Sequence, residues 1–136
     1  MKTLIKKLNN LQRQIKAPKD QNNEFGGFVY RNAEQIMQEV KKHIPDDCLL
    51  VVNNEMLMVG DRYYVKSIAT FTDGENSITS AAFAREALAQ KGMVDAMLTG
   101  STGSYSDKYA LGKLLLISDG DMDEVNNWEN EAEEYH

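Results

Sequence analysis

Aromatic and cationic side chains stand next to each other at four places along the chain. Aromatic rings can stack on nucleic-acid bases, at about 1–3 kcal/mol per base, while cations contact the phosphate backbone. These contacts tolerate any base sequence, because every base has a π-face. The candidates for such chemistry are Tyr30-Arg31, Tyr63-Tyr64-Val65-Lys66, Phe83-Ala84-Arg85, and Tyr105 with Lys108-Tyr109.

Some of these rings are expected inside the protein. Tyr63 and Tyr64 point to opposite faces of an extended strand, so we expect at least one of them in the core. We expect Tyr109 to pack against its own protein rather than to stack on a base.

Residue patterns typical of catalysis are missing from the chain. Residues 100–108 combine glycines, hydroxyls and a lysine, but they lack the Gly-Lys-Ser/Thr ending of a phosphate-binding loop. His43 and His136 are the only histidines, and neither has ligand-like neighbours at metal-binding spacing. A nucleophilic Ser101 or Ser104 would need a base, and no histidine lies nearby in sequence. The sequence therefore predicts no enzyme, no catalytic residue, no cofactor and no metal.

The net charge of −6 conceals an uneven distribution. All 15 Lys and Arg lie before residue 119, together with 13 acids, which gives that part a net charge of +2. Residues 119–136 carry eight acids and neither Lys nor Arg. The net charge of the whole chain combines these two regions and so hides a potential anion-binding surface in the first of them. We therefore predict three pieces, which are a basic amphipathic helix with its linker (1–24), a core (25–118) and an acidic flexible tail (119–136).

Cysteine content and hydropathy indicate the cellular compartment in which the protein is expected. Cys48 is the only cysteine, so a disulfide within the chain is impossible and a reducing cytoplasm is expected. No apolar run approaches the roughly 20 residues needed to span a bilayer. The N-terminus has no apolar stretch typical of a signal peptide. No membrane partner is expected.

Two helices are predicted before the sheet. Residues 1–16 carry a helical stripe of Leu4, Leu8, Leu11 and Ile15 surrounded by lysines. This helix either packs on the protein or a neighbour, or acts as a basic arm that touches DNA or a membrane. Residues 17–27 are expected to form a linker. A second helix begins at Asn32, a capping residue with Gln35 three positions on, continues with Ile36, Val40 and Ile44, and ends at Pro45.

From Cys48 to Arg85 the hydrophobic period changes to two, which is typical of strands. Turns are predicted at Gly60-Asp61 and at Asp73-Gly74. A last helix follows a break at Gly92 and runs to about Leu116, and its glycines indicate close approach of another backbone or a phosphate. The predicted fold class is α+β, a three-stranded antiparallel meander with flanking helices.

Several sequence blocks, in this order and spacing, resemble the essential recombination function (ERF) family of phage and prophage single-strand annealing proteins. The resemblance covers about residues 25 to 119. Its blocks are Tyr-Arg-x-Ala-Glu at 30–34, Tyr-Val-Lys at 64–66, Ala-Arg-Glu at 84–86 and Ser-Tyr-x-x-Lys-Tyr-Ala-Leu at 104–111. Two positions depart from the family pattern, since Met97 replaces a glutamine and Asp107 replaces a basic residue.

The resemblance implies a β-β-β-α core similar to the eukaryotic strand-annealing recombinases. It further implies ATP-independent binding and annealing of single-stranded DNA in phage recombination, by homo-oligomeric rings or filaments with a shared DNA groove. The implied DNA-binding residues include stacking candidates (Tyr30, Tyr105), phosphate contacts (Arg31, Lys66, Arg85, Lys91, Lys108) and the serines Ser101 and Ser104.

Two rival functions compete with annealing. One is an interaction module that does not anneal and docks on a host or phage replication or recombination protein through its acidic tail. Asp107 and the eight tail carboxylates favour this alternative. The other is a small hydrolase, which lacks a catalytic constellation. The tail itself could occupy the basic groove and compete with phosphates, aid solubility alone, or dock Trp128 onto a partner.

Overall fold

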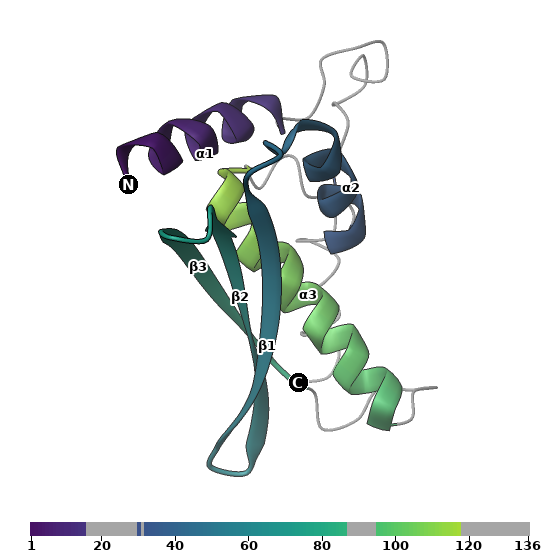
Figure 1. Cartoon of the computed structure of the whole chain (residues 1–136). Helices are drawn as coiled ribbons and strands as arrows, with labels where there is room; N and C mark the ends of the chain where they lie inside the picture. The colour runs from purple at the N-terminus through teal and green to yellow at the C-terminus, as the bar shows by residue number, and fades with distance from the viewer. Residues whose placement is uncertain (16–29, 31, 87–94, 118–136) are drawn as a thin grey trace.

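The computed structural model describes residues 1–15, 30, 32–86 and 95–117, with backbone only for 95–101. It contains three helices and three strands in the order predicted from the sequence (Figure 1). The predicted linker 17–27 and the acidic tail lie outside the described residues, as do Arg31 and Lys91. The elements are α1 (Lys2–Gln14), α2 (Ala33–His43), β1 (Leu49–Val59), β2 (Arg62–Thr72), β3 (Ser77–Arg85) and α3 (Asp95–Leu115).

The three strands form an antiparallel sheet in the order β1-β2-β3, so the predicted meander and the α+β fold class are confirmed. Gly60 and Gly74 stand in the two hairpin turns with positive φ angles. Glycine adopts this conformation without the steric cost of a Cβ. In the second turn the Asp73 carboxylate accepts the backbone N–H groups of Glu75 and Asn76. Both predicted turn positions are therefore correct.

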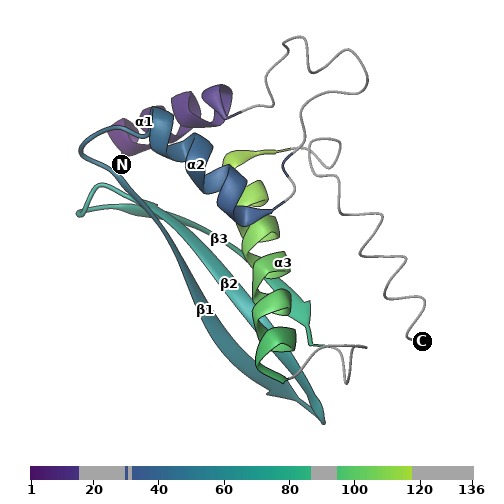
Figure 2. The ribbon, with the colours of Figure 1, turned by 90° about the vertical axis from the view of Figure 1, so that its right-hand side faces the viewer.

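Helix α3 covers one face of the sheet, and Figure 2 shows no described helix along the other face. Side chains on β2 alternate accordingly. The residues turned toward α3 are buried, and those between them are only partly buried. The buried set is Val65, Ser67, Ala69 and Phe71. The same alternation was expected from the period-two pattern, and α3 determines which of the two faces is the core.

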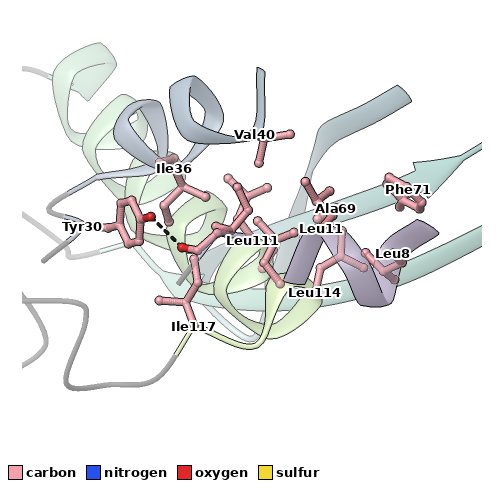
Figure 3. Close-up of a cluster of buried hydrophobic side chains, with 14 of the residues drawn as sticks. Leu8, Leu11, Tyr30, Ile36, Val40, Ala69, Phe71, Leu111, Leu114 and Ile117 are labelled. Atoms are coloured by element: carbon pink, nitrogen blue, oxygen red, sulfur yellow. Dashed lines mark hydrogen bonds between the residues drawn. The ribbon is translucent and has the colours of Figure 1, made fainter. Parts of the chain in front are cut away.

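Helix α1 packs into the same core as α2 and α3 (Figure 3). Its predicted apolar stripe is buried, and each such side chain contributes about 1.5–3 kcal/mol by leaving water. Gln12 Nε2 donates to the Leu114 carbonyl oxygen at 2.9 Å, and Lys7 forms an ion pair with Asp47. Of the two alternatives for this helix, packing on its own protein is the one observed.

Helix α2 begins and ends as its sequence predicts. The Asn32 side chain accepts the backbone N–H of Gln35 at 2.9 Å and so caps the helix. The helix ends at His43, shortly before Pro45. Its buried residues are Ala33, Ile36 and Val40.

Candidate nucleic-acid interface

The sheet face turned away from α3, called here the outer face, gathers aromatic and cationic side chains from two strands. The register pairs Lys66 with Phe83 and Tyr64 with Arg85, so each pair lies side by side on this face. The Lys66 ammonium lies 5.7 Å from the centre of the Phe83 ring, within cation–π range. Phe83 is 57% exposed and Arg85 is exposed as well.

This arrangement can bind an extended polyanion that carries flat rings. Side chains paired across neighbouring strands are about 4.5–5.5 Å apart. An exposed phenyl ring between two cations can thus stack on a base while the ammonium and guanidinium groups contact phosphates on either side. Nothing in the set reads the edge of a particular base, so the surface suits binding without sequence preference.

Along strand β1, which forms one edge of the sheet, the outer face is mainly aliphatic. Four of its residues there are aliphatic and exposed, in contrast to the aromatic and cationic residues of β2 and β3. Asn53 and Glu55 lie between them, and Glu55 is the register partner of Lys66. Exposed apolar side chains that gather together mark contact surfaces for other proteins. The exposed aliphatic residues are Leu49, Val51, Leu57 and Val59.

A second polar group, the serine cluster (Asn54, Ser67, Ser106 and Asp107), joins the sheet to α3. The Ser67 hydroxyl donates to Asp107 Oδ1 at 2.5 Å and lies 2.6 Å from Ser106 Oγ. Asn54 Nδ2 donates to both Ser67 Oγ (2.8 Å) and Asp107 Oδ1 (2.7 Å). Ser67 and Ser106 are fully buried. Sequence analysis missed this cluster, although a serine on an apolar strand face signals a buried hydrogen-bond partner.

Two residues predicted to contact DNA lie in the interior instead. Tyr30 is 0% exposed, and its hydroxyl donates to the Ile15 carbonyl oxygen at 2.6 Å (Figure 3). Lys108 is 1% exposed, with its ammonium 5.6 Å from the centre of the Tyr109 ring. Both side chains are enclosed in this structure, so the surface described above does not include them, and their DNA contacts stay predictions. Tyr30 joins the core between the end of α1 and the start of α2.

The expectation for the neighbouring tyrosines of β2 is wrong. Neither Tyr63 nor Tyr64 is in the core, and Tyr63 is 49% exposed. Tyr63 has the same orientation as Val65, but it lies beside Met58 near the end of the β1–β2 hairpin, which the described helices leave uncovered. Tyr109 is packed against the core as predicted.

Comparison with known proteins assigns the chain to a family. A family model described as the ERF superfamily matches residues 4–136. The chain belongs to the ERF superfamily. The Essential recombination function protein of Salmonella phage P22 is 42% identical over 134 residues, which cover 96% of this chain and 65% of the phage protein. The chain therefore spans about two thirds of the length of this relative. No solved structure matches.

The ERF match is wider than the resemblance recognised from sequence blocks. It includes α1 and the acidic tail, whereas the blocks covered only about residues 25 to 119. The helix that supplies Leu4, Leu8 and Leu11 to the core is thus part of the ERF unit. The predicted boundary at residue 24 divides α1 from α2 and α3, although residues of all three helices share one core.

The remaining candidate residues of this ERF chain divide between two sides of the sheet. Lys66 and Arg85 come together on the outer face. Ser104 is exposed and Tyr105 partly buried on α3, which lies on the opposite side. The side chain of Ser101 lies outside the described residues. Those predicted residues that the structure describes therefore do not form one continuous surface.

Asp107, the acidic departure from the ERF pattern, has a structural explanation. Its carboxylate accepts hydrogen bonds from Asn54 and Ser67 and so connects α3 with β1 and β2. A hydrogen bond with a charged partner typically contributes about 1.5–3 kcal/mol. Asp107 thus connects elements within the protein.

The part of the chain that the structure describes holds no arrangement suited to a metal ion. Among the described residues, no group of three or more His, Cys, Asp or Glu side chains is placed to bind one. None of the described helices is both long and apolar enough to cross a membrane.

Proposed function

We propose that this ERF protein acts in phage recombination by binding single-stranded DNA on its outer face and annealing complementary strands without nucleotide or metal. The observation that carries the proposal is the juxtaposition of exposed Phe83 with Lys66 and Arg85. The name of the phage P22 relative, a recombination function protein, supports the same biological context.

Annealing needs no group that makes or breaks bonds. The protein must hold one strand extended, with base edges accessible, until a complementary strand pairs with it. Stacking on Phe83 and Tyr64 would keep bases ordered, while Lys66 and Arg85 would neutralise phosphates. Residues before 119 carry a net charge of only +2, so one protomer would bind weakly.

Assembly of several protomers would supply the missing affinity. Repeated copies of one weak surface multiply affinity through effective concentration. Strand β1 is an edge of the sheet and carries exposed apolar side chains, including Met56, Met58 and Val59. An edge of this kind can contact a neighbouring protomer. Light scattering that shows only a 15.3 kDa species, with and without DNA, would contradict assembly.

Two variants test the proposed DNA surface. Phe83→Ala should weaken binding to oligonucleotides of any sequence. Lys66→Gln with Arg85→Gln should lower affinity and reduce the slope of log K against log salt by about 1.4, since each single-strand phosphate contact contributes about 0.7. Lys41→Gln with Lys42→Gln is the matched control, because it removes two exposed cations from α2.

Annealing of complementary oligonucleotides, followed in EDTA without nucleotide, tests the activity itself. Wild-type protein should exceed the protein-free rate, and the two outer-face variants should fall toward it. If wild-type protein matched the protein-free rate, annealing would be rejected. If the outer-face and control variants bound DNA equally, the DNA surface would have to lie elsewhere.

A further inference from the structure

The solvent-facing side of α1 carries cations in helical register. Lys2, Lys6 and Arg13 follow one another at spacings of four and seven positions, which places them on one face, opposite the buried leucines. All three are exposed. The polar residues between them, Asn9 and Asn10, are exposed as well, and α1 contains no Asp or Glu. This set of three cations is called here the α1 stripe.

The orientation of the α1 stripe is fixed by contacts on the other side of the helix. Leu4, Leu8 and Leu11 are buried in the core, and Gln12 donates to the carbonyl oxygen of Leu114 in α3. Lys7 is held by Asp47 and therefore does not belong to the stripe. The three stripe cations are thus presented to solvent by a helix that cannot turn about its axis without exposing its core residues.

The charges of the stripe serve the helix unequally. Arg13 lies in the last turn, where a cation is favourable, and its Nε donates to Asn9 Oδ1 at 2.8 Å. Lys2 lies at the opposite end. The N-terminal end of a helix has positive partial charge, where acidic residues stabilise and cations destabilise. Helix α1 has Lys2 in its first turn, no acidic residue there and no side-chain cap. Local rules are broken most often at functional sites. An anion bound beside Lys2 would offset the unfavourable electrostatics of the first turn.

We propose that the α1 stripe contacts the phosphates of a second DNA strand while the outer face holds the first. This inference rests on the proposed function, because annealing requires two strands on the protein at once. The stripe cations lie on the side of α1 opposite its buried leucines, whereas Lys66 and Arg85 lie on the sheet face turned away from α3. They are distinct surfaces on one protomer.

A membrane surface is the other polyanion that a basic helix can contact, and the structure argues against it. An amphipathic helix binds a bilayer by inserting its apolar face into the interface. The apolar face of α1 is already buried against α2, α3 and the sheet. Met1 and Ile5 are its exposed apolar side chains, and two residues at one end make no continuous apolar face. The stripe cations face solvent, where the phosphates of a nucleic-acid backbone can contact them.

The test compares Lys6→Gln with Arg13→Gln in the full chain against the matched control Lys41→Gln with Lys42→Gln. Each removes two exposed cations from one helix and, with them, one surface contact, from Arg13 to Asn9 or from Lys42 to Glu39. Exposed contacts of this kind contribute about 0–1 kcal/mol, and neither variant touches the core, so both should unfold close to the wild-type temperature. First-strand affinity is measured with one labelled oligonucleotide. Second-strand capture is measured by adding a labelled non-complementary oligonucleotide to immobilised protein that already holds a first strand.

The α1 variant should keep the first-strand affinity of the control. Its capture of the second strand and its annealing rate should fall about tenfold at low salt, and the salt slope of capture should decrease by about 1.4. Capture equal to that of the control would overturn the proposal. Equal losses of first-strand and second-strand binding would also overturn it, since the stripe would then belong to the first-strand site.

The same proteins distinguish three further outcomes. If the α1 variant lost binding to phosphatidylserine vesicles but captured the second strand normally, the stripe would be a lipid contact and the proposal would be rejected. If wild-type protein bound no first strand, the proposed function itself would fail, and the second-strand surface with it. If only Lys66→Gln with Arg85→Gln lost DNA binding, and the α1 variant captured the second strand like the control, the first-strand surface would be supported and the role of the stripe would be rejected.

Discussion

Ser67 illustrates how a single hydroxyl group connects three elements of this ERF protein. It stands on the apolar face of β2, between the buried residues Val65 and Ala69. The Ser67 oxygen accepts a hydrogen bond from Asn54 on β1, and the Ser67 hydroxyl donates a hydrogen bond to Asp107 on α3. A buried polar network of this kind stabilises the protein only when each member has its partner.

Replacing Ser67 by alanine should therefore cost stability. The variant removes the hydrogen bond that Ser67 donates to the Asp107 carboxylate, and a hydrogen bond to a charged group typically contributes about 1.5–3 kcal/mol. Urea unfolding should show a loss of this size. Ser104→Ala is the control, because Ser104 is exposed on α3. Loss of an exposed hydroxyl should change the free energy of unfolding by less than about 0.5 kcal/mol. Similar values for both variants would mean that the cluster contributes nothing.

At the scale of elements, the end of α3 places a residue with a side chain in a backbone conformation that favours glycine. Leu116 follows the helix with a positive φ, in the left-handed region that glycine usually occupies at this position. The Ile117 N–H donates to the Gly112 carbonyl oxygen at 2.9 Å, the hydrogen bond typical of a Schellman ending. The Leu116 side chain is 70% exposed and so buries little surface in exchange.

Leu116→Gly should stabilise the protein by about 1 kcal/mol, because glycine adopts the left-handed conformation without the steric cost of a Cβ. The gain should appear as a higher urea midpoint with unchanged slope. Leu116→Ala keeps the Cβ and should give no comparable gain. A glycine variant less stable than the alanine variant would contradict this view of the helix end.

The β2–β3 turn predicts a dependence on pH. Hydrogen bonds from the backbone N–H groups of Asn76 and Glu75 lower the pKa of Asp73 below its ordinary value of 3.8. A lowered pKa in the folded state contributes stability above the unfolded value, and this contribution disappears as pH falls through the folded pKa. The turn should therefore weaken in acid.

Asp73→Asn isolates this contribution, because the amide oxygen can still accept hydrogen bonds but does not titrate. Unfolding free energies of both proteins should be compared from neutral pH to below the folded pKa of Asp73. The wild-type advantage should be present at neutral pH and shrink as the solution becomes acidic. A difference that stayed constant over the whole range would exclude the ionised carboxylate as its source.

At the scale of the whole molecule, charge is segregated along the chain. The outer face and the α1 stripe expose cations, whereas residues 119–136 carry eight carboxylates. A tail of this composition has few apolar residues apart from Trp128 with which to fold by itself. It can compete with phosphates for the cationic surfaces of its own or a neighbouring protomer.

Deleting residues 120–136 should tighten binding of single-stranded DNA, most strongly at low salt. The gain should shrink at physiological ionic strength, where the Debye length is about 8 Å. A tail of full length with every Asp and Glu replaced by its amide should reproduce the effect, since charge rather than length is responsible. Equal affinity of all three proteins at low salt would leave solubility or docking on a partner as the role of the tail.

The sequence by itself determined the features that depend on neighbours a few positions apart. The Asn32 cap, the stripe from Leu4 to Ile15, and the two turn glycines follow from helical and strand periodicity and from backbone sterics. Three antiparallel strands followed by a helix could be predicted for the same reason. These interactions join residues that are close in sequence, so they do not depend on how the helices and strands pack together.

Only the tertiary structure decided which side chains of those elements are accessible. Tyr30 and Lys108 belong to ERF-like blocks, yet packing of α1 and α2 buries the tyrosine and the lysine is enclosed too. The pairing of β2 with β3 brings Lys66 to Phe83, and Ser67 meets Asp107 from a distant part of the sequence. Burial and long-range pairing depend on how elements stack, and neither the strand period nor the helical period encodes that arrangement.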